Sequence, residues 1–208
     1  MGGRPSMVMQ WYDKGCAAEY LKGPGLGVNR MSLIYDVTQG LNYLHTLSPP
    51  IVHGDLKGNN VLITNEGHAV LSDFGLSKVI EDLVGPTGYT PSSPEVGPLR
   101  WQAPEFVEDE KCKLGLETDV WSFGCTAYEL LTNYTPYYYR TKDALIMRDM
   151  REGIKPPGPD GMSPFTQDER VITLLYDACW SFSPSSRLQM STIVLQVGEI
   201  CANPKAIA

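Results

Sequence analysis

The sequence predicts a mainly α domain with a small β insert. Apolar residues recur at the spacing of one helical face through residues 30–47, which indicates an amphipathic helix. Residues 118–131 are apolar almost all round, which is typical of a buried central helix. Between these two segments, the short β-rich runs 61–64 and 69–72 flank the turn Asn65-Glu66-Gly67 and predict a hairpin.

The N-terminal part is predicted to hold one strand and two helices. Residues 7–11 read as a short strand, and residues 17–21 read as a brief helix. Asn29 is placed to cap the helix 30–47, and Pro49-Pro50 ends it.

The rest of the chain alternates between connections and helices. Residues 51–52 are a further short β-rich run, and residues 82–99 are so rich in Gly, Pro and Ser that we expect a long mobile loop, of the kind that is usually functional or disordered. Amphipathic helices are expected at residues 143–152, 168–180 and 190–201.

Composition narrows the class of protein. The 208 residues are 42% apolar, which is enough to build a core, and the net charge is −7 without a Lys/Arg cluster. This argues against nucleic acid or an anionic membrane as a partner. The five cysteines are scattered without a Cys-x-x-Cys pair, and no apolar run reaches membrane-spanning length. We therefore expect a cytoplasmic protein without a membrane segment.

Polar side chains are concentrated in one loop between the β-rich runs. Asp55, Lys57 and Asn60 lie within six residues, and Asp73 opens the loop that follows the predicted hairpin. Carboxylate and amide oxygens are ligands that Mg²⁺ prefers. An unligated Asp55 can take a proton from an incoming hydroxyl, and Lys57 can neutralise charge on a transferred group. The sequence therefore predicts a metal-bound phosphate at this loop.

Four short motifs follow one another along the chain: His53-Gly54-Asp55 with Asn60, Asp73-Phe74-Gly75, Ala103-Pro104-Glu105, and Asp119-Val120-Trp121-Ser122-Phe123-Gly124. These motifs and their order resemble those of the eukaryotic protein kinases, from about residue 7 to the C-terminus. Trp101, Cys179-Trp180 and Arg187 resemble the tyrosine-kinase-like branch, whereas Lys57 resembles the Ser/Thr-specific form of the loop.

The resemblance implies a catalytic role for four residues. Asp55 matches the proton acceptor and Lys57 the lysine that contacts phosphate. Asn60 and Asp73 match the magnesium ligands, so ATP and Mg²⁺ are the implied cofactors and a protein substrate or partner protein is implied as well.

The resemblance also implies an adenine site and a structural frame. Met9 matches the residue at the back of the adenine pocket, residues 10–12 (with Gln10 and Tyr12) match the hinge, and Leu62 matches the apolar residue beneath adenine. The implied frame is a buried Glu105–Arg187 ion pair, Asp119 bracing the catalytic loop from below, His53 as a packed support, and His45 as a residue at a helix end.

The family pattern divides the chain into three parts, and the chain also departs from this pattern at several positions. Residues 1–14 match the last strand of the small lobe and the hinge, residues 15–202 match the large lobe, and residues 203–208 form a tail. The Gly-rich loop, the phosphate-binding lysine and its glutamate partner are not found in this sequence. Gly54 replaces the usual arginine, so a phosphate on the loop 82–99 has no partner there. Pro98 stands where a Ser or Thr commonly reaches the catalytic Asp and Lys, which argues against efficient peptide phosphorylation.

Two functions follow, and both stay open at this point. The first is a protein kinase domain that transfers the ATP γ-phosphate to Ser or Thr, with Tyr as the lesser choice. The second is a non-catalytic, pseudokinase-like binding module or scaffold. Removing one preorganised donor costs roughly 10²–10³ in rate, so the physics favours the second for these residues alone. We expect an incomplete gene product of a protein kinase that is not active by itself.

Overall fold

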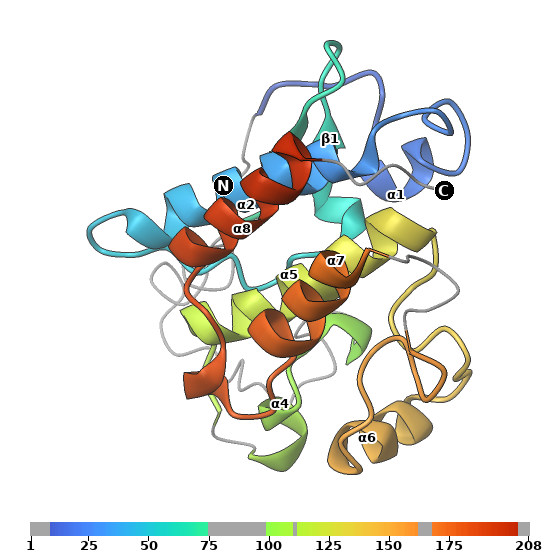
Figure 1. The fold of residues 1–208 in the computed structure, drawn as a ribbon, viewed down its shortest axis with the longest axis vertical. Coiled ribbons are helices and arrows are strands. Elements are labelled where there is room, and N and C mark those ends of the chain that lie inside the picture. The colour runs from blue at the N-terminus through green and yellow to red at the C-terminus, as the bar shows by residue number, and fades with distance from the viewer. Residues whose placement is uncertain (1–8, 75–98, 110–111, 162–167, 204–208) are drawn as a thin grey trace, which may run out of the picture.

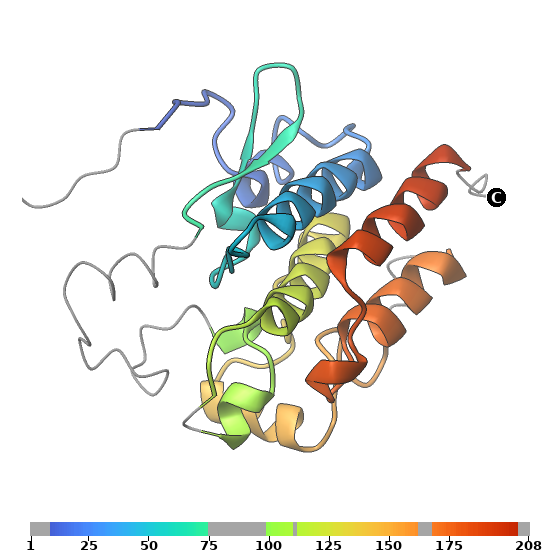
Figure 2. The same cartoon turned by 90° about the vertical axis from the view of Figure 1, so that its left-hand side faces the viewer.

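Helix α5 (Leu116–Thr132) runs through the middle of the structure, and the other elements pack around it. The computed structural model describes residues 9–74, 99–109, 112–161 and 168–203. Helix α2 (Arg30–Thr46) lies along one side of α5, and α8 (Met190–Ala202) lies along α2, as Figures 1 and 2 show. The described part of the chain is mainly helical with a two-stranded sheet, so the predicted fold class is confirmed.

The remaining helices are short and join these long ones. The α-helices are α1 (Ala17–Tyr20), α4 (Glu105–Glu108), α6 (Asp143–Arg151) and α7 (Glu169–Thr173), the 3₁₀ turns are η1 (Gly58–Asn60), η2 (Leu99–Trp101) and η4 (Pro184–Ser186), and η3 (Leu174–Cys179) is a π-helix.

Helix α5 is central because its sequence is apolar on all sides. Val120, Trp121 and Phe123 are all buried, although they point in different directions around the helix. The Gly115 amide donates to Thr118 Oγ1 at 3.0 Å, which satisfies one of the free amides before the helix. The helix therefore begins two residues earlier than the sequence predicted, at Leu116.

Helix α2 follows its prediction closely. The side chain of Asn29 accepts hydrogen bonds from the amides of Met31 and Ser32 at 3.1 and 3.3 Å, so Asn29 is the N-cap. The helix ends at Thr46, before the two prolines. Its predicted apolar face is buried: Leu33, Ile34, Val37, Leu41 and Leu44.

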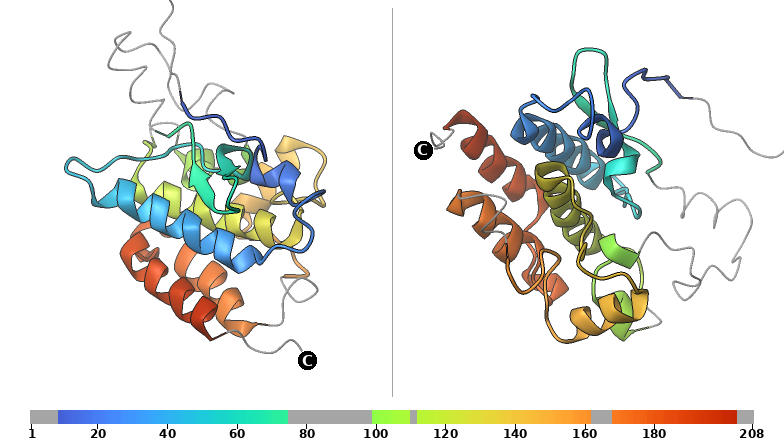
Figure 3. Two further views of the ribbon diagram at one scale, coloured as in Figure 1. Left: turned by 90° about the horizontal axis from the view of Figure 1, so that it is seen from above. Right: turned by 90° about the vertical axis from the view of Figure 1, so that its right-hand side faces the viewer.

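The predicted hairpin is present above α2. Strands β1 (Val61–Ile63) and β2 (Ala69–Leu71) are antiparallel, with Val61 opposite Leu71. Figure 3, in its left-hand view, shows the hairpin lying over α2. Gly67 in the turn has a φ of +94°, a conformation that suits glycine. The hairpin therefore fixes the end of the loop that precedes β1 and the start of the segment that follows β2.

Three predicted elements differ from the structure. Residues 9–11 form no strand, and residues 7–8 lie outside the described part; a strand requires a partner, and none pairs with 9–11 within the described residues. Residues 51–52 are also outside any strand, because the amide of Ile51 donates to Leu44 O at the end of α2 instead. The predicted helix 168–180 becomes α7 followed by η3, whose wider turn lets the Trp180 amide reach Leu175 O.

The predicted helices 143–152 and 190–201 match α6 and α8 within one residue at each end. The predicted loop 82–99 lies outside the described residues apart from Leu99, which opens η2.

Candidate functional site

The loop between α2 and β1 is held from below by one buried carboxylate. Asp119, near the start of α5, is 1% exposed and accepts from the amides of His53 at 2.7 Å and Gly54 at 2.9 Å. Its Oδ2 also lies 2.9 Å from Nε2 of His45. Asp119 therefore braces the loop, as predicted, and His45 is more than a residue at a helix end.

Asp55, Lys57 and Asn60 form one polar cluster. Lys57 Nζ lies 2.5 Å from Asp55 Oδ2, and the amide nitrogen of Asn60 donates to the same oxygen at 2.9 Å. The Asn60 amide nitrogen also donates to the backbone carbonyl of Asp55 at 2.8 Å. The Asp55 side chain keeps 35% of its surface exposed, so a molecule in solvent can reach this carboxylate.

The cluster has the chemistry of a proton acceptor beside a cation. Two donors converge on Asp55 Oδ2 and fix the orientation of this carboxylate, which is the kind of group that can accept a proton or orient a hydroxyl. Lys57 places a positive charge next to it.

Hydrogen bonds from the neighbouring residue Ser72 place Asp73 close to Asn60. The amide and the hydroxyl of Ser72 both donate to Asn60 O, at 2.9 and 3.1 Å, which places the next residue, Asp73, beside the loop. Asp73 has a φ of +57°, an uncommon conformation for a residue with a side chain. Such conformations cluster at functional sites.

The residues present fit a magnesium ion. The nitrogen end of the Asn60 amide donates to Asp55, so its oxygen end is the end that could bind a metal ion, and Asp73 could add a carboxylate. Mg²⁺ needs few protein oxygens and completes its shell with water and phosphate oxygens.

His53 supports the loop from its buried side. It is 2% exposed, its Nδ1 accepts from the Asp55 amide at 3.3 Å, and its ring lies edge-on to Phe74 with centroids 6.5 Å apart. Burial lowers the pKa of His53, against the charges of Asp119, Asp55 and Asp73, which raise it. The prediction of a packed, hydrogen-bonded support agrees with this placement.

The predicted adenine residues are only partly brought together. Leu62 pairs with Cys16 in an isolated bridge, and the Ile63 amide donates to Gly15 O at 2.9 Å, so the segment after Tyr12 runs beside β1. Met9 is 48% exposed and Gln10 is exposed as well, with Tyr12 Oη donating to Gln10 Oε1 at 3.4 Å. Leu62 is therefore half-buried, whereas Met9 is exposed.

One residue of the site is absent from the sequence-based prediction. Glu129 in α5 is buried and accepts from the amide of Gly58, inside the loop. The signal that could have found it is a carboxylate in the last turn of a largely apolar helix, since a buried charge requires donors.

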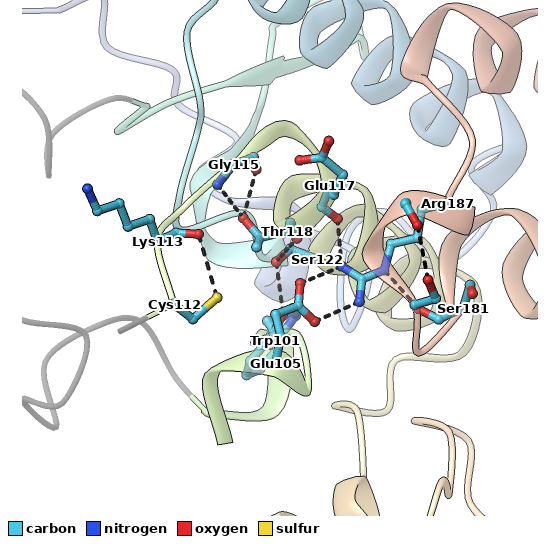
Figure 4. A network of polar contacts seen from close by, with 12 residues as sticks. Trp101, Glu105, Cys112, Lys113, Gly115, Glu117, Thr118, Ser122, Ser181 and Arg187 are labelled. Carbon is cyan, nitrogen blue, oxygen red and sulfur yellow. Dashed lines mark hydrogen bonds and ion pairs between the residues drawn. The ribbon is translucent and has the colours of Figure 1, made fainter. Parts of the chain in front are cut away.

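A second polar network, centred on Arg187, joins the segment after η4 to α4 and to the start of α5. Arg187 donates to both oxygens of Glu105, each at 2.7 Å, and to the backbone carbonyls of Glu117 and Ser181 at 2.9 Å (Figure 4). The predicted Glu105–Arg187 ion pair is confirmed.

No helix in the described part of the chain is both long and apolar enough to cross a membrane.

Comparison with known proteins finds relatives that are named as protein kinases. Receptor-interacting serine/threonine-protein kinase 2 of Bos taurus is 30% identical over 160 residues, 76% of this chain and 30% of that protein. Serine/threonine-protein kinase TNNI3K of Homo sapiens is 31% identical over 176 residues, 84% of this chain and 20% of that protein. Tyrosine-protein kinase JAK1 of Danio rerio is 30% identical over 220 residues, 97% of this chain and 18% of that protein.

The chain thus spans 18–30% of the length of these relatives. The family model of protein tyrosine and serine/threonine kinases matches residues 1–197, which is nearly the whole chain. The chain therefore belongs to the protein tyrosine and serine/threonine kinase family.

Proposed function

We propose that this chain carries the phosphoryl-transfer loop of a protein kinase that moves the γ-phosphate of MgATP to a Ser or Thr hydroxyl of a protein. The observation that carries the proposal is the cluster at Asp55 Oδ2, which lies 2.5 Å from Lys57 Nζ and 2.9 Å from the Asn60 amide nitrogen. A carboxylate held by a cation and an amide suits positioning and charge stabilisation, which dominate phosphoryl transfer.

Each residue has one task in this proposal. Asp55 orients the hydroxyl and accepts its proton, and Lys57 neutralises charge on the transferred group. Asn60 and Asp73 hold Mg²⁺, which when bound neutralises charge on the phosphate oxygens. Leu62 contributes an apolar surface to the adenine side, and Met9, Gln10 and Tyr12 belong to the hinge that borders it.

Ser or Thr is preferred over Tyr as the acceptor because of Lys57. A lysine two residues after the proton acceptor resembles the Ser/Thr-specific form of the loop, and Lys57 Nζ lies 2.5 Å from Asp55 Oδ2. The domain boundaries belong to the same proposal: residues 1–14 as hinge, residues 15–202 as the large lobe and residues 203–208 as a tail.

Thermal unfolding in the presence of MgATP tests the proposal. A ligand at 100 times its Kd stabilises the folded state by about 2.7 kcal/mol, which is a readily measured rise in Tm. We expect the rise for the unchanged protein and for Asp55→Asn, which keeps its shape but cannot take a proton. We expect no rise for Asp73→Ala or Asn60→Ala, and an unchanged rise for Asp143→Ala, an exposed carboxylate on α6.

Transfer is then measured separately with a Ser/Thr peptide and a Tyr peptide on the longest available form of the protein. Loss of transfer in Asp55→Asn with MgATP binding retained supports the assigned role. Absence of any MgATP-dependent rise in Tm would remove the nucleotide-binding function and leave a non-catalytic binding module as the alternative.

A further inference from the structure

The ammonium of Lys14 connects two turns that lie beside the candidate site. Lys14 Nζ donates to the backbone carbonyl of Asn65 at 2.9 Å, although the two residues are 51 positions apart in the chain. Asn65 opens the turn between β1 and β2 (residues 65–67, the hairpin turn), whereas Lys14 follows residues 10–12, which are proposed as the hinge. One side chain therefore spans from the end of the hinge to the hairpin.

The turn that carries Lys14 is defined by its own contacts. The Gly15 amide donates to Tyr12 O at 3.1 Å, which closes a β-turn over residues 12–15 (the hinge turn). Gly15 has a φ of +68°, a conformation that suits glycine. The indole of Trp11 donates to Asp13 Oδ1 at 3.0 Å. Because the backbone of the hinge turn is specified in this way, the Lys14 side chain leaves it from a fixed position.

The same ammonium lies against an aromatic ring and close to a glycine. Lys14 Nζ is 5.7 Å from the centroid of the Tyr20 ring in α1, which is within the range of a cation–π contact. A Cβ added at Gly67, in the hairpin turn, would lie 4.0 Å from this nitrogen, so the hairpin turn comes near Lys14 at a second point. The hinge turn, α1 and the hairpin turn therefore meet at one nitrogen atom.

Backbone contacts continue from Lys14 along β1. The Ile63 amide donates to Gly15 O at 2.9 Å, and Cys16 forms an isolated antiparallel bridge with Leu62. Lys14 extends this row of contacts to the hairpin turn. Because Leu62 is the residue proposed beneath adenine, the separation between the hinge and this apolar surface depends on the whole row.

We propose that Lys14 is a positioning residue for the adenine side of the site, and that it fastens the hinge turn to the hairpin turn. The inference deepens the proposed function and rests on its assignment of the hinge and of the apolar surface beneath adenine. A lysine suits this task, because its ammonium has three donors on a flexible stem and can serve a carbonyl and a ring face together. Without the ammonium, the hinge turn would keep its backbone pairing with β1 and lose its tie to the hairpin turn.

Two measurements on the whole 208-residue chain test this role. The first is the exchange rate of the Ile63 amide hydrogen, followed by NMR, because this amide donates to the residue after Lys14. The second is the Kd for MgATP and for adenosine. Lys14→Met keeps the stem and removes the charge and the donors. Loss of one hydrogen bond corresponds to about three- to tenfold, and we expect Ile63 exchange to be faster and both ligands to bind more weakly by such a factor.

Conservative and matched variants separate positioning from the loss of a surface charge. Lys14→Arg keeps a cation with donors, so it is expected to restore most of the Ile63 protection and of the affinity for both ligands. Lys142→Met, the same change at an exposed lysine before α6, is expected to alter neither quantity. The urea midpoint of Lys14→Met is expected to stay close to that of the unchanged protein, because a single contact near the surface contributes little to global stability.

The outcomes are distinct from those of the proposed function. Unchanged Ile63 exchange in Lys14→Met would overturn the tie between the two turns. Faster exchange with unchanged affinity for both ligands would overturn the positioning role, and so would a weaker affinity for MgATP alone, since that effect would lie on the phosphate side. An unchanged protein that binds neither ligand refutes the proposed function and the positioning role with it, while the expected exchange pattern would still establish the tie between the turns.

Discussion

Arg187 and Glu105, which are 82 residues apart in the chain, face each other with two nitrogens against two oxygens, at 2.7 Å for each pair. The Arg187 side chain is 0% exposed, and its guanidinium also lies over the ring of Trp121 at 5.2 Å from the centroid. The pair therefore fastens the segment after η3 to α4 and to the start of α5.

Removing Arg187 is expected to destabilise the fold strongly. Arg187→Met leaves the Glu105 carboxylate without its cation and the Ser181 and Glu117 carbonyls without their donor. Breaking a buried pair from one side costs about 3–5 kcal/mol. Urea unfolding measures this loss. Arg151→Met is the matched control, because this arginine is exposed and donates to the Val107 carbonyl at 3.4 Å, a contact that contributes about 1 kcal/mol or less. Equal losses in both variants would contradict the assigned role.

Replacing Asp119 is expected to loosen the loop selectively. In Asp119→Asn, the side-chain nitrogen must face either the His53 amide or the Gly54 amide, so at least one buried donor loses its acceptor. An unsatisfied buried donor costs about 1–3 kcal/mol. Hydrogen exchange of the His53 and Gly54 amides is expected to accelerate more than that of core amides in α5. Asp143→Asn, at an exposed position, serves as the control. Uniform acceleration across the protein would show a general loss of stability instead.

Gly54 is expected to resist substitution because of its backbone. Its φ is +80°, where a side chain costs about 1–2 kcal/mol. Gly54→Ala should therefore lower the free energy of unfolding by about that amount. Gly23→Ala is the control: a Cβ there meets no atom within 4 Å, and its φ is not in the left-handed region. A variant Gly54→Ala as stable as the unchanged protein would show that the loop adopts another backbone conformation.

The elements with strong local signals were predictable from the sequence. Helix α2 carries its own cap at Asn29 and a regular apolar face, and the hairpin carries a turn with Gly67, so local chemistry determines both. The strand predicted at residues 7–11 depends on a partner, and no local signal reports whether one is present. No local signal predicted the wider turns of η3 either; its end packs closely on α5, where an added Cβ at Gly124 would approach the side chains of Cys179 and Trp180 within 2.8 Å.

The loop and its supports Asp119 and His53 were predicted, whereas the contacts of Glu129 and His45 were not. Asp55, Lys57, Asn60 and Asp73 are close in sequence, so their spacing alone suggested one cluster. Glu129 and His45 lie far from the residues that they contact, at separations of 71 residues from Gly58 and 74 residues from Asp119. Only the fold brings such pairs together. A buried acid in an apolar helix indicates that a partner exists, and it does not indicate which one.

The pH dependence of stability is expected to report the burial of His53. Burial lowers the pKa of His53 below its usual value of 6.5, although Asp119, Asp55 and Asp73 face it and act in the opposite direction. Above this value both the folded and the unfolded chain hold a neutral His53, so the stability is fully present. As the pH falls below 6.5, the unfolded chain binds a proton at His53 that the folded chain does not bind, and stability is lost at up to about 1.4 kcal/mol per pH unit.

Urea midpoints between pH 8 and pH 5 measure this loss. His53→Phe keeps a ring in contact with Phe74 and removes the titrating group, so its midpoint should fall less steeply with pH than that of the unchanged protein. Because Phe has no acceptor for the Asp55 amide, the variant is also expected to be less stable at pH 8 by about 1–3 kcal/mol. Parallel pH profiles for the two proteins would show that other groups, and not His53, account for the loss of stability in acid.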